Sequence, residues 1–133
     1  AEQLQVSQYI TWLGEINQEQ ALKEYQNCDA FVLPSLYESM GIVYIEALAC
    51  GKPIIATKCG GPESTVTPFN GLLIEKENVT KLASALHYMI ENRDKYDSNQ
   101  IRQDFLARYS AGAVVPQLMA LYKQVLEKHP GIS

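Results

Sequence analysis

Two short, unbroken apolar runs constrain the fold of this chain more than any other feature of its sequence. They read AFVLP at residues 30–34 and PIIAT at residues 53–57, with no alternation between apolar and polar positions. A strand that is apolar on both faces is typical of a parallel sheet covered by helices on both sides. Runs at residues 9–13 (YITWL) and 71–74 (GLLI) predict two more strands.

Segments with the signs of helices lie between and after these runs. Five of them have apolar periodicity or capping residues: 17–28, 42–50, a segment that begins at Asn78 or Thr80, 93–108 and 111–128. Strands that alternate with helices predict βαβ units, and hence an α/β fold with a Rossmann-like open parallel sheet and helices on both faces. In such sheets, ligands bind beyond the carboxyl ends of the strands.

The size and charge of the chain narrow its function class. Its 133 residues, 47% of them hydrophobic, suit a single domain spanning residues 1–133. Its formal charge is -4, and 11 basic residues are scattered among 15 acidic ones, which argues against a nucleic-acid partner. The three cysteines lack the spacing of a zinc site. Because a secretory signal and a membrane-length apolar run are both missing from the sequence, we expect a cytoplasmic location.

The loop after the run at 30–34 leads directly into a predicted helix. It reads PSLYESMGIVYIE, and the backbone amides of about Gly41, Ile42 and Val43 lack helical acceptors there. Together with the helix dipole, such amides form an anion site that holds phosphate without a lysine. Gly41 has no Cβ to block a close approach of the ligand.

Two glutamates flank this helix start. Glu46 lies about one turn into the helix among apolar neighbours, where an ionised carboxylate needs hydrogen-bond donors. The vicinal hydroxyls of a ribose are suitable donors, and Glu38 on the other side completes a pair that could bracket a diphosphate. Spacing alone leaves another interpretation open, since acidic residues favour helix N-termini for dipole reasons and Glu46 could pair with a lysine or a backbone amide.

The stretch FVLPSLYESMGIVYIEALACGKPIIAT, followed by GGPE, resembles the GT-B glycosyltransferases of group 1, also called family 4. The signature of that family has two glutamates separated by seven residues, then P-[IV]-[IV]-A-T and a GG turn, and this chain reproduces it from Pro34 to Gly61. A weaker likeness continues through NGLL at residues 70–73. The resemblance covers nearly the whole chain and implies the C-terminal half of a GT-B fold, without the N-terminal domain that holds the acceptor.

The resemblance also implies roles for individual residues. Glu46 matches the glutamate that binds the ribose hydroxyls of the donor, and Glu38 matches the glutamate at the donor sugar, which makes it the candidate catalytic residue. The resemblance implies that the segment between the two glutamates contacts the donor. It also implies that the loop after residues 9–13 lies near the nucleotide base of the donor. The further donor-binding residues are Ser39, Met40, Gly41, Ile42 and Val43, and the base-proximal residues are Leu13, Gly14 and Glu15.

By resemblance, the full-length protein is a retaining glycosyltransferase. It is expected to move a sugar from a nucleoside-diphosphate sugar to a saccharide or lipid-linked acceptor, as in polysaccharide biosynthesis, with no cofactor and no metal ion. Its expected partners are the donor and its own N-terminal domain, and only the full-length enzyme is expected to associate peripherally with a membrane. The isolated chain is expected to bind donor weakly and to transfer nothing, because the acceptor domain and the family's Arg/Lys clamp for the diphosphate lie outside it.

One position departs from the family pattern, and two alternatives stay open. Family members commonly carry a glutamate where this chain has Ser64, whereas Glu63 comes one residue earlier, so no role is transferred to Glu63. One alternative is a related GT-B sugar phosphorylase or nucleotide-sugar epimerase. The other is a non-enzymatic Rossmann-like regulatory module of the flavodoxin or receiver type, although a receiver needs acids at strand ends and Asp29 precedes a strand instead.

Overall fold

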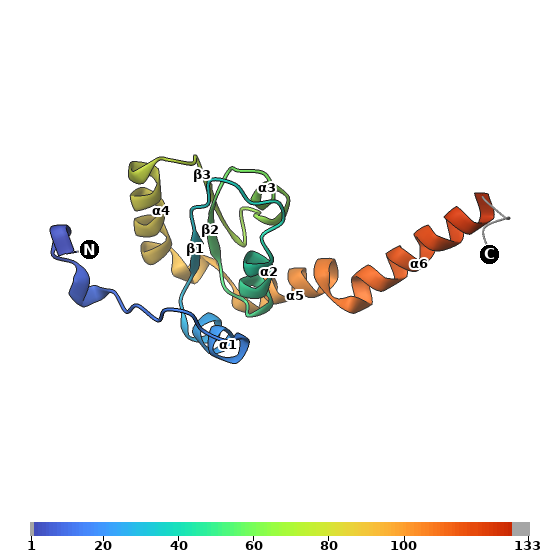
Figure 1. Ribbon diagram of the computed structural model, residues 1–133, viewed down its shortest axis with the longest axis horizontal. Helices are drawn as coiled ribbons and strands as arrows, with labels where there is room; N and C mark the ends of the chain where they lie inside the picture. The colour runs from blue at the N-terminus through green and yellow to red at the C-terminus, as the bar shows by residue number, and fades with distance from the viewer. Residues whose placement is uncertain (1, 129–133) are drawn as a thin grey trace.

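The computed structural model describes residues 2–128 and has an α/β architecture (Figure 1). Short 3-10 helices precede the first α-helix and the fifth one. The elements are, in chain order, η1 (Glu2–Leu4), η2 (Ser7–Tyr9), α1 (Gln18–Asn27), β1 (Phe31–Leu33), α2 (Ile42–Ala49), β2 (Ile54–Thr57), α3 (Pro62–Thr65), β3 (Gly71–Ile74), α4 (Val79–Glu91), η3 (Arg93–Lys95), α5 (Ser98–Tyr109) and α6 (Ala111–Lys128).

The sheet is parallel, with the strand order β1-β2-β3. Phe31 lies opposite Ile54, and Ile54 lies opposite Gly71, so that the three strands start level with one another. All four residues of the central strand β2 are buried. The apolar runs at 30–34, 53–57 and 71–74 therefore formed the strands that their unbroken pattern predicted.

Helices cover both faces of this sheet. On one face, Tyr44 and Leu48 of α2 and Ile101 of α5 pack around Ile54 in one cluster. On the other face, Ala85 and Met89 of α4 pack on Ile55 and Ile74. Figure 1 shows α4 on one side of the strands and α2 with α5 on the other. Because neighbouring residues of a strand point to opposite faces, Ile54 and Ile55 belong to different halves of the core.

Side-chain caps decide where several helices begin. Asn17 and Gln20 form a reciprocal capping box at the start of α1, and the side chain of Asn78 accepts from the Lys81 amide at the start of α4. Of the two starts considered for α4, Asn78 is therefore the cap. The single helix predicted over residues 93–108 is wrong, because Asp97 accepts two backbone hydrogen bonds and starts α5 at Ser98, after the separate turn η3.

The strand predicted at residues 9–13 is also wrong. The described part of the chain has three strands, and this segment instead leaves η2 as an extended but unpaired stretch. In Figure 1 it runs away from the sheet, and its largest side chains, Tyr9 and Trp12, are 80% and 79% exposed. A strand needs a neighbouring strand for its backbone hydrogen bonds, and no described strand lies beside this one.

Helix α6 extends away from the sheet beyond α5 (Figure 1). Its bounds match the segment predicted at 111–128, and none of its residues is buried. The turn predicted at residues 60–62 is present, but Pro62 also opens the short helix α3, where its missing N–H is no loss at a first helical position.

Candidate functional site

The loop between β1 and α2 is tied down at Glu38 by two hydrogen bonds. Its Oε1 accepts from the backbone N–H of Gly41 at 3.0 Å, and its backbone carbonyl accepts from the N–H of Gly61 at 2.7 Å. The second bond joins this loop to the glycine turn that follows β2. Glu38 therefore lies where the carboxyl ends of two neighbouring parallel strands meet, as expected for a ligand site of an open α/β sheet.

A glycine and a tyrosine fix the start of α2. Gly41 precedes the helix with φ at 71°, a left-handed conformation that favours glycine. Tyr44, one turn later, is fully buried and donates from its hydroxyl to the carbonyl of Leu33 at 2.8 Å. This bond links the first turn of α2 to the carboxyl end of β1 and holds the helix start at the edge of the sheet.

The N-terminus of α2 presents two free amides, where the sequence predicted about three. The amide of Gly41 is taken by Glu38. Among the described residues, the amides of Ile42 and Val43 have no acceptor, and the side chain of Ile42 is 64% exposed. Met40 beside it is 55% exposed. The helix start is thus open to solvent and can receive an anionic group through two backbone donors.

Glu46 lies in a groove between α1 and α2. The hydroxyl of Tyr25 donates to its Oε2 at 3.1 Å, and within the described residues its Oε1 receives no hydrogen bond. The groove has a volume of about 420 Å³. Its remaining lining residues are Gln18, Glu19, Ala21, Leu22, Ala49 and Cys50. A half-buried carboxylate with one engaged and one open oxygen is suited to accept hydrogen bonds from a ligand with hydroxyl groups.

Burial and Glu46 together perturb the phenol of Tyr25. Burial is the larger cause and raises its pKa well above the ordinary range, and the hydrogen bond to Glu46 and the charge of that carboxylate raise the pKa further. Tyr25 is therefore a neutral donor at neutral pH. The need of Glu46 for a donor, predicted from its apolar neighbours, is thus met from another helix.

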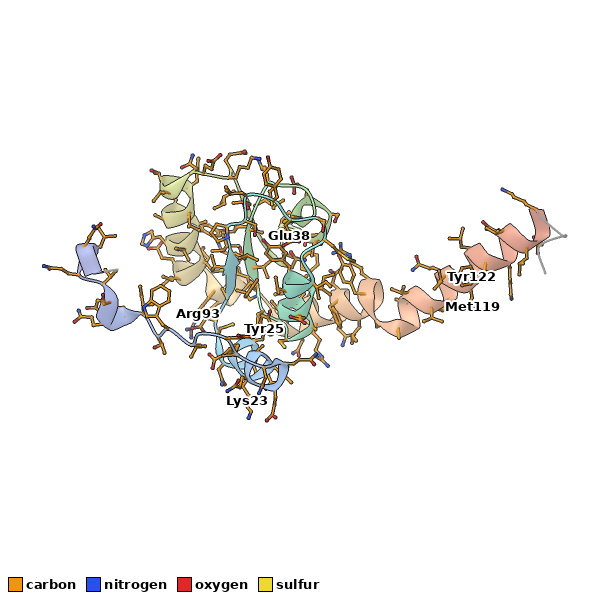
Figure 2. The ribbon with its side chains drawn as sticks, viewed as in Figure 1. Lys23, Tyr25, Glu38, Arg93, Met119 and Tyr122 are labelled. Carbon is orange, nitrogen blue, oxygen red and sulfur yellow. The ribbon has the colours of Figure 1, made fainter. Side chains whose placement is uncertain are left out.

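Glu38 lines a second groove, of about 500 Å³. Its other lining residues are Tyr37, Ser39, Cys59, Gly60, Gly61 and Ser64. Figure 2 shows Glu38, in the loop that precedes α2, well apart from Tyr25 on α1. The two glutamates therefore line separate grooves, and the free amides of Ile42 and Val43 lie between them in the sequence.

Several residues of the site were missed from the sequence. The sequence predicted no role for Tyr25 beyond its place in the helix at residues 17–28, and it assigned the glycine pair at 60–61 only to a turn. Glu63 accepts from the amides of Cys59 and Gly60 at 3.3 and 2.9 Å, which gives it a role in holding that turn. Because β1 and β2 are neighbours, the loop after β2 had to lie beside the loop after β1, and this signal could have identified the turn.

The residues expected near the base are not part of either groove. Leu13, Gly14 and Glu15 lie in the exposed segment before α1. The groove of Glu46 is lined by α1 from Gln18 onward and by none of these three residues. Their role near a base stays a prediction.

No metal centre is present among the residues that the structure describes. No group of three or more potential ligands gathers there. His87 is exposed and lies 3.3 Å from Glu91 one turn along α4, and His129 lies outside the described residues. The three cysteines are free and partly buried. None of the helices between residues 2 and 128 is both long enough and apolar enough to cross a membrane.

The sequence matches known proteins over most of its length. A family model described as "Glycosyl transferases group 1" matches residues 1–104. The GDP-mannose-dependent monoacylated alpha-(1-6)-phosphatidylinositol monomannoside mannosyltransferase of Corynebacterium glutamicum is 36% identical over 65% of this chain and 25% of its own length. The D-inositol 3-phosphate glycosyltransferase of Corynebacterium urealyticum is 31% identical over 98% of this chain and 33% of its own length. The chain thus spans a quarter to a third of these relatives.

Solved structures show the same fold. Sucrose-phosphate synthase from Thermosynechococcus elongatus superposes with a TM-score of 0.84 at 30% identity, over 96% of this chain and 33% of that one. Anabaena HepE in complex with UDP-glucose superposes with a TM-score of 0.80 at 24% identity, over 92% of this chain and 34% of that one. Both likenesses confirm the predicted α/β, Rossmann-like fold.

Proposed function

Since the chain belongs to the group 1 glycosyl transferases, we propose that it is the donor-binding domain of a retaining glycosyltransferase. The complete enzyme would transfer a sugar from a nucleoside-diphosphate sugar to a saccharide or lipid-linked acceptor. The alternatives of a phosphorylase, an epimerase or a regulatory module are not favoured, because the relatives described above are named glycosyltransferases or mannosyltransferases.

The observation that carries this proposal is the environment of Glu46. Its Oε2 is engaged by a neutral donor, and its Oε1 is open to the groove between α1 and α2. A ribose offers two vicinal hydroxyls that can both donate to one carboxylate. We therefore assign the ribose of the donor to Glu46 and the rest of the nucleoside to the largely apolar groove beside it.

The neighbouring amides suit the diphosphate. With the ribose at Glu46, the phosphates would lie over the free amides of Ile42 and Val43, flanked by Ser39, Met40 and Gly41. The sugar would then lie in the groove of Glu38, which is the candidate catalytic residue. Backbone donors aimed at the leaving diphosphate stabilise the charge that develops on it, so the reaction as proposed needs no metal ion and no cofactor.

Other parts of the enzyme complete the reaction. We propose that a preceding N-terminal domain supplies the acceptor site and the cationic clamp for the diphosphate. The enzyme would be cytoplasmic, associate peripherally with a membrane only as the full-length protein, and serve polysaccharide biosynthesis. The 133 residues alone are expected to transfer no sugar. Sugar transfer by this chain in a radiolabelled-donor assay would contradict the proposal that a second domain is needed for the reaction.

Calorimetric or NMR titration with UDP, GDP, ADP and their sugar conjugates tests the donor site. The relatives point to different donors, GDP-mannose in the name of one and UDP-glucose in the complex of another. We expect saturable binding of one nucleotide, weakened roughly tenfold to a hundredfold by Glu46→Ala, which removes hydrogen bonds to a charged group. The control is Glu24→Ala, an exposed position on α1 outside the groove, which should bind like the unchanged protein. Equal affinity in the Glu46→Ala variant would refute the site.

A further inference from the structure

We propose that Tyr25 is a positioning residue that orients Glu46 toward a vicinal diol, and that it thereby sets the preference of the site for ribose over deoxyribose. The inference rests on the proposed function, because it concerns the same carboxylate. Its structural basis is the hydrogen bond of 3.1 Å from the Tyr25 hydroxyl to Oε2 of Glu46. The two residues lie on different helices, 21 positions apart in sequence.

A row of aromatic rings holds Tyr25 in place. Its ring meets the ring of Phe31 edge to face, with centroids 5.4 Å apart and planes at 61°. Phe31 meets Tyr44 in the same way, at 5.9 Å and 75°. Tyr44 is in turn fixed by its hydroxyl to the carbonyl of Leu33. The ring of Tyr25 is therefore packed against the sheet through Phe31, which limits the movement of its hydroxyl.

The bond leaves one oxygen of Glu46 available in a defined direction. A free glutamate side chain rotates about its last carbon–carbon bond and loses this freedom when a ligand binds. With Oε2 held by Tyr25, Oε1 is already directed to the groove, so less orientational entropy is lost on binding. A ligand with two adjacent hydroxyls gains most from this arrangement, because both donate to the same preoriented carboxylate.

The chemistry of the donor also matters. A lysine in place of Tyr25 would neutralise Glu46 and compete with the ligand for it, whereas a phenol orients the carboxylate and leaves its charge in place. Burial and Glu46 raise the pKa of Tyr25, which keeps the phenol protonated and donating. Tyr25 and Glu46 both line the groove, and the hydrogen bond between them is the contact through which the proposed role is exerted.

The test compares ribonucleotides with deoxyribonucleotides. The probes are the nucleoside diphosphate that binds best among UDP, GDP and ADP, and its 2′,3′-dideoxy counterpart, titrated into the whole chain by NMR. Tyr25→Phe keeps the ring that packs on Phe31 and removes only the hydroxyl. We expect it to weaken binding of the ribonucleotide about fivefold, because the orientation of Glu46 is lost while its charge remains, and to leave the dideoxynucleotide unchanged. Tyr9→Phe, at a side chain that is 80% exposed, is the matched control.

A double-mutant cycle separates this inference from the proposed function. In the Glu46→Ala background, Tyr25→Phe should have no further effect, because the group that it orients is gone. If Glu46→Ala abolishes the ribose preference but Tyr25→Phe does not reduce it, the positioning role is wrong and the donor site stands. Equal weakening of both nucleotides by Tyr25→Phe would reveal a structural role and overturn the proposal. If Glu46→Ala leaves the ribose preference intact, or if the folded chain binds no nucleotide, the proposed site and the positioning role fail together.

Discussion

The ring of Tyr44 occupies the space that a Cβ on Gly41 would need. A methyl group built on Gly41 would overlap two atoms of that ring, and the backbone there has φ at +71°. We therefore expect Gly41→Ala to lower the free energy of unfolding by about 2–4 kcal/mol, from left-handed strain and overpacking together. Urea denaturation followed by circular dichroism measures this change.

Gly14→Ala is the matched control for this substitution. Gly14 has nearly the same conformation, with φ at +66°, but nothing lies within 4 Å of a Cβ built there. This variant should show only the backbone strain, about 1 kcal/mol. If both variants lose the same stability, the contact with Tyr44 does not set the requirement for glycine at position 41.

Removing the hydroxyl of Tyr44 should loosen α2 from the sheet. Tyr44 is fully buried, and its hydroxyl bonds the carbonyl of Leu33 at 2.8 Å. In Tyr44→Phe that bond is lost at a buried position, where water does not replace it. We therefore expect a decrease of about 1–2 kcal/mol in the free energy of unfolding. Tyr122→Phe, on the exposed surface of α6 (Figure 2), should leave stability unchanged in the same denaturation experiment.

The phenol of Tyr25 should titrate at higher pH than an ordinary tyrosine. NMR of protein whose tyrosines are labelled at the ring carbon that bears the hydroxyl can follow this titration. The signal that is missing in Tyr25→Phe is the signal of Tyr25. Burial is the largest cause of the raised pKa, followed by the hydrogen bond to Glu46. Glu46→Gln should therefore lower the pKa of Tyr25 only part of the way to the ordinary value. A return to the full ordinary value would mean that burial is not the main cause.

The same shift predicts how stability depends on pH. Because the pKa of Tyr25 is raised on folding, its contribution to stability is complete below the ordinary tyrosine pKa of about 10 and is lost as the pH rises through the folded value. The stability difference between the unchanged protein and Tyr25→Phe should therefore shrink as the solution becomes strongly alkaline. Urea midpoints of both proteins at neutral and alkaline pH measure it, and a constant difference would contradict the shift.

The apolar face of α6 should make the isolated chain self-associate. Val115, Leu118, Tyr122 and Val125 lie at helical spacing and are 51%, 43%, 54% and 46% exposed. Figure 2 shows this helix standing clear of the rest of the domain. Sedimentation velocity over a wide concentration range should detect oligomers that disappear in the double variant Leu118→Lys, Tyr122→Lys. Gln124→Lys adds a charge elsewhere on the helix and should leave the oligomers in place.

Local patterns predicted the parts of this fold that local interactions determine. The strands β1, β2 and β3 follow from continuous apolar runs, and the starts of α1 and α4 follow from Asn17 and Asn78 as caps. The segment at residues 9–13 has the composition of a strand, but strand formation depends on a neighbour that no local pattern specifies. The error there is one of pairing and not of propensity.

The same limit applies to the candidate site. The sequence placed Glu38 and Glu46 on either side of a helix start, and the structure agrees with that order. It did not predict that the two would open into separate grooves, because the spacing of residues along a helix says nothing of where the preceding helix packs. The contact of Glu46 with Tyr25 depends on that packing and spans 21 positions.

The strand order of the sheet has a consequence for how the domain folds during its synthesis. Each strand pairs with the next one along the chain, β1 with β2 and β2 with β3. Twenty residues (34–53) lie between β1 and β2 and thirteen (58–70) between β2 and β3, so each loop closes with less loss of chain entropy than a pairing of more distant strands would cost. During synthesis, β1, α2 and β2 can come together before the residues of α6 have left the ribosome. We expect the sheet to assemble in the order in which its strands are translated.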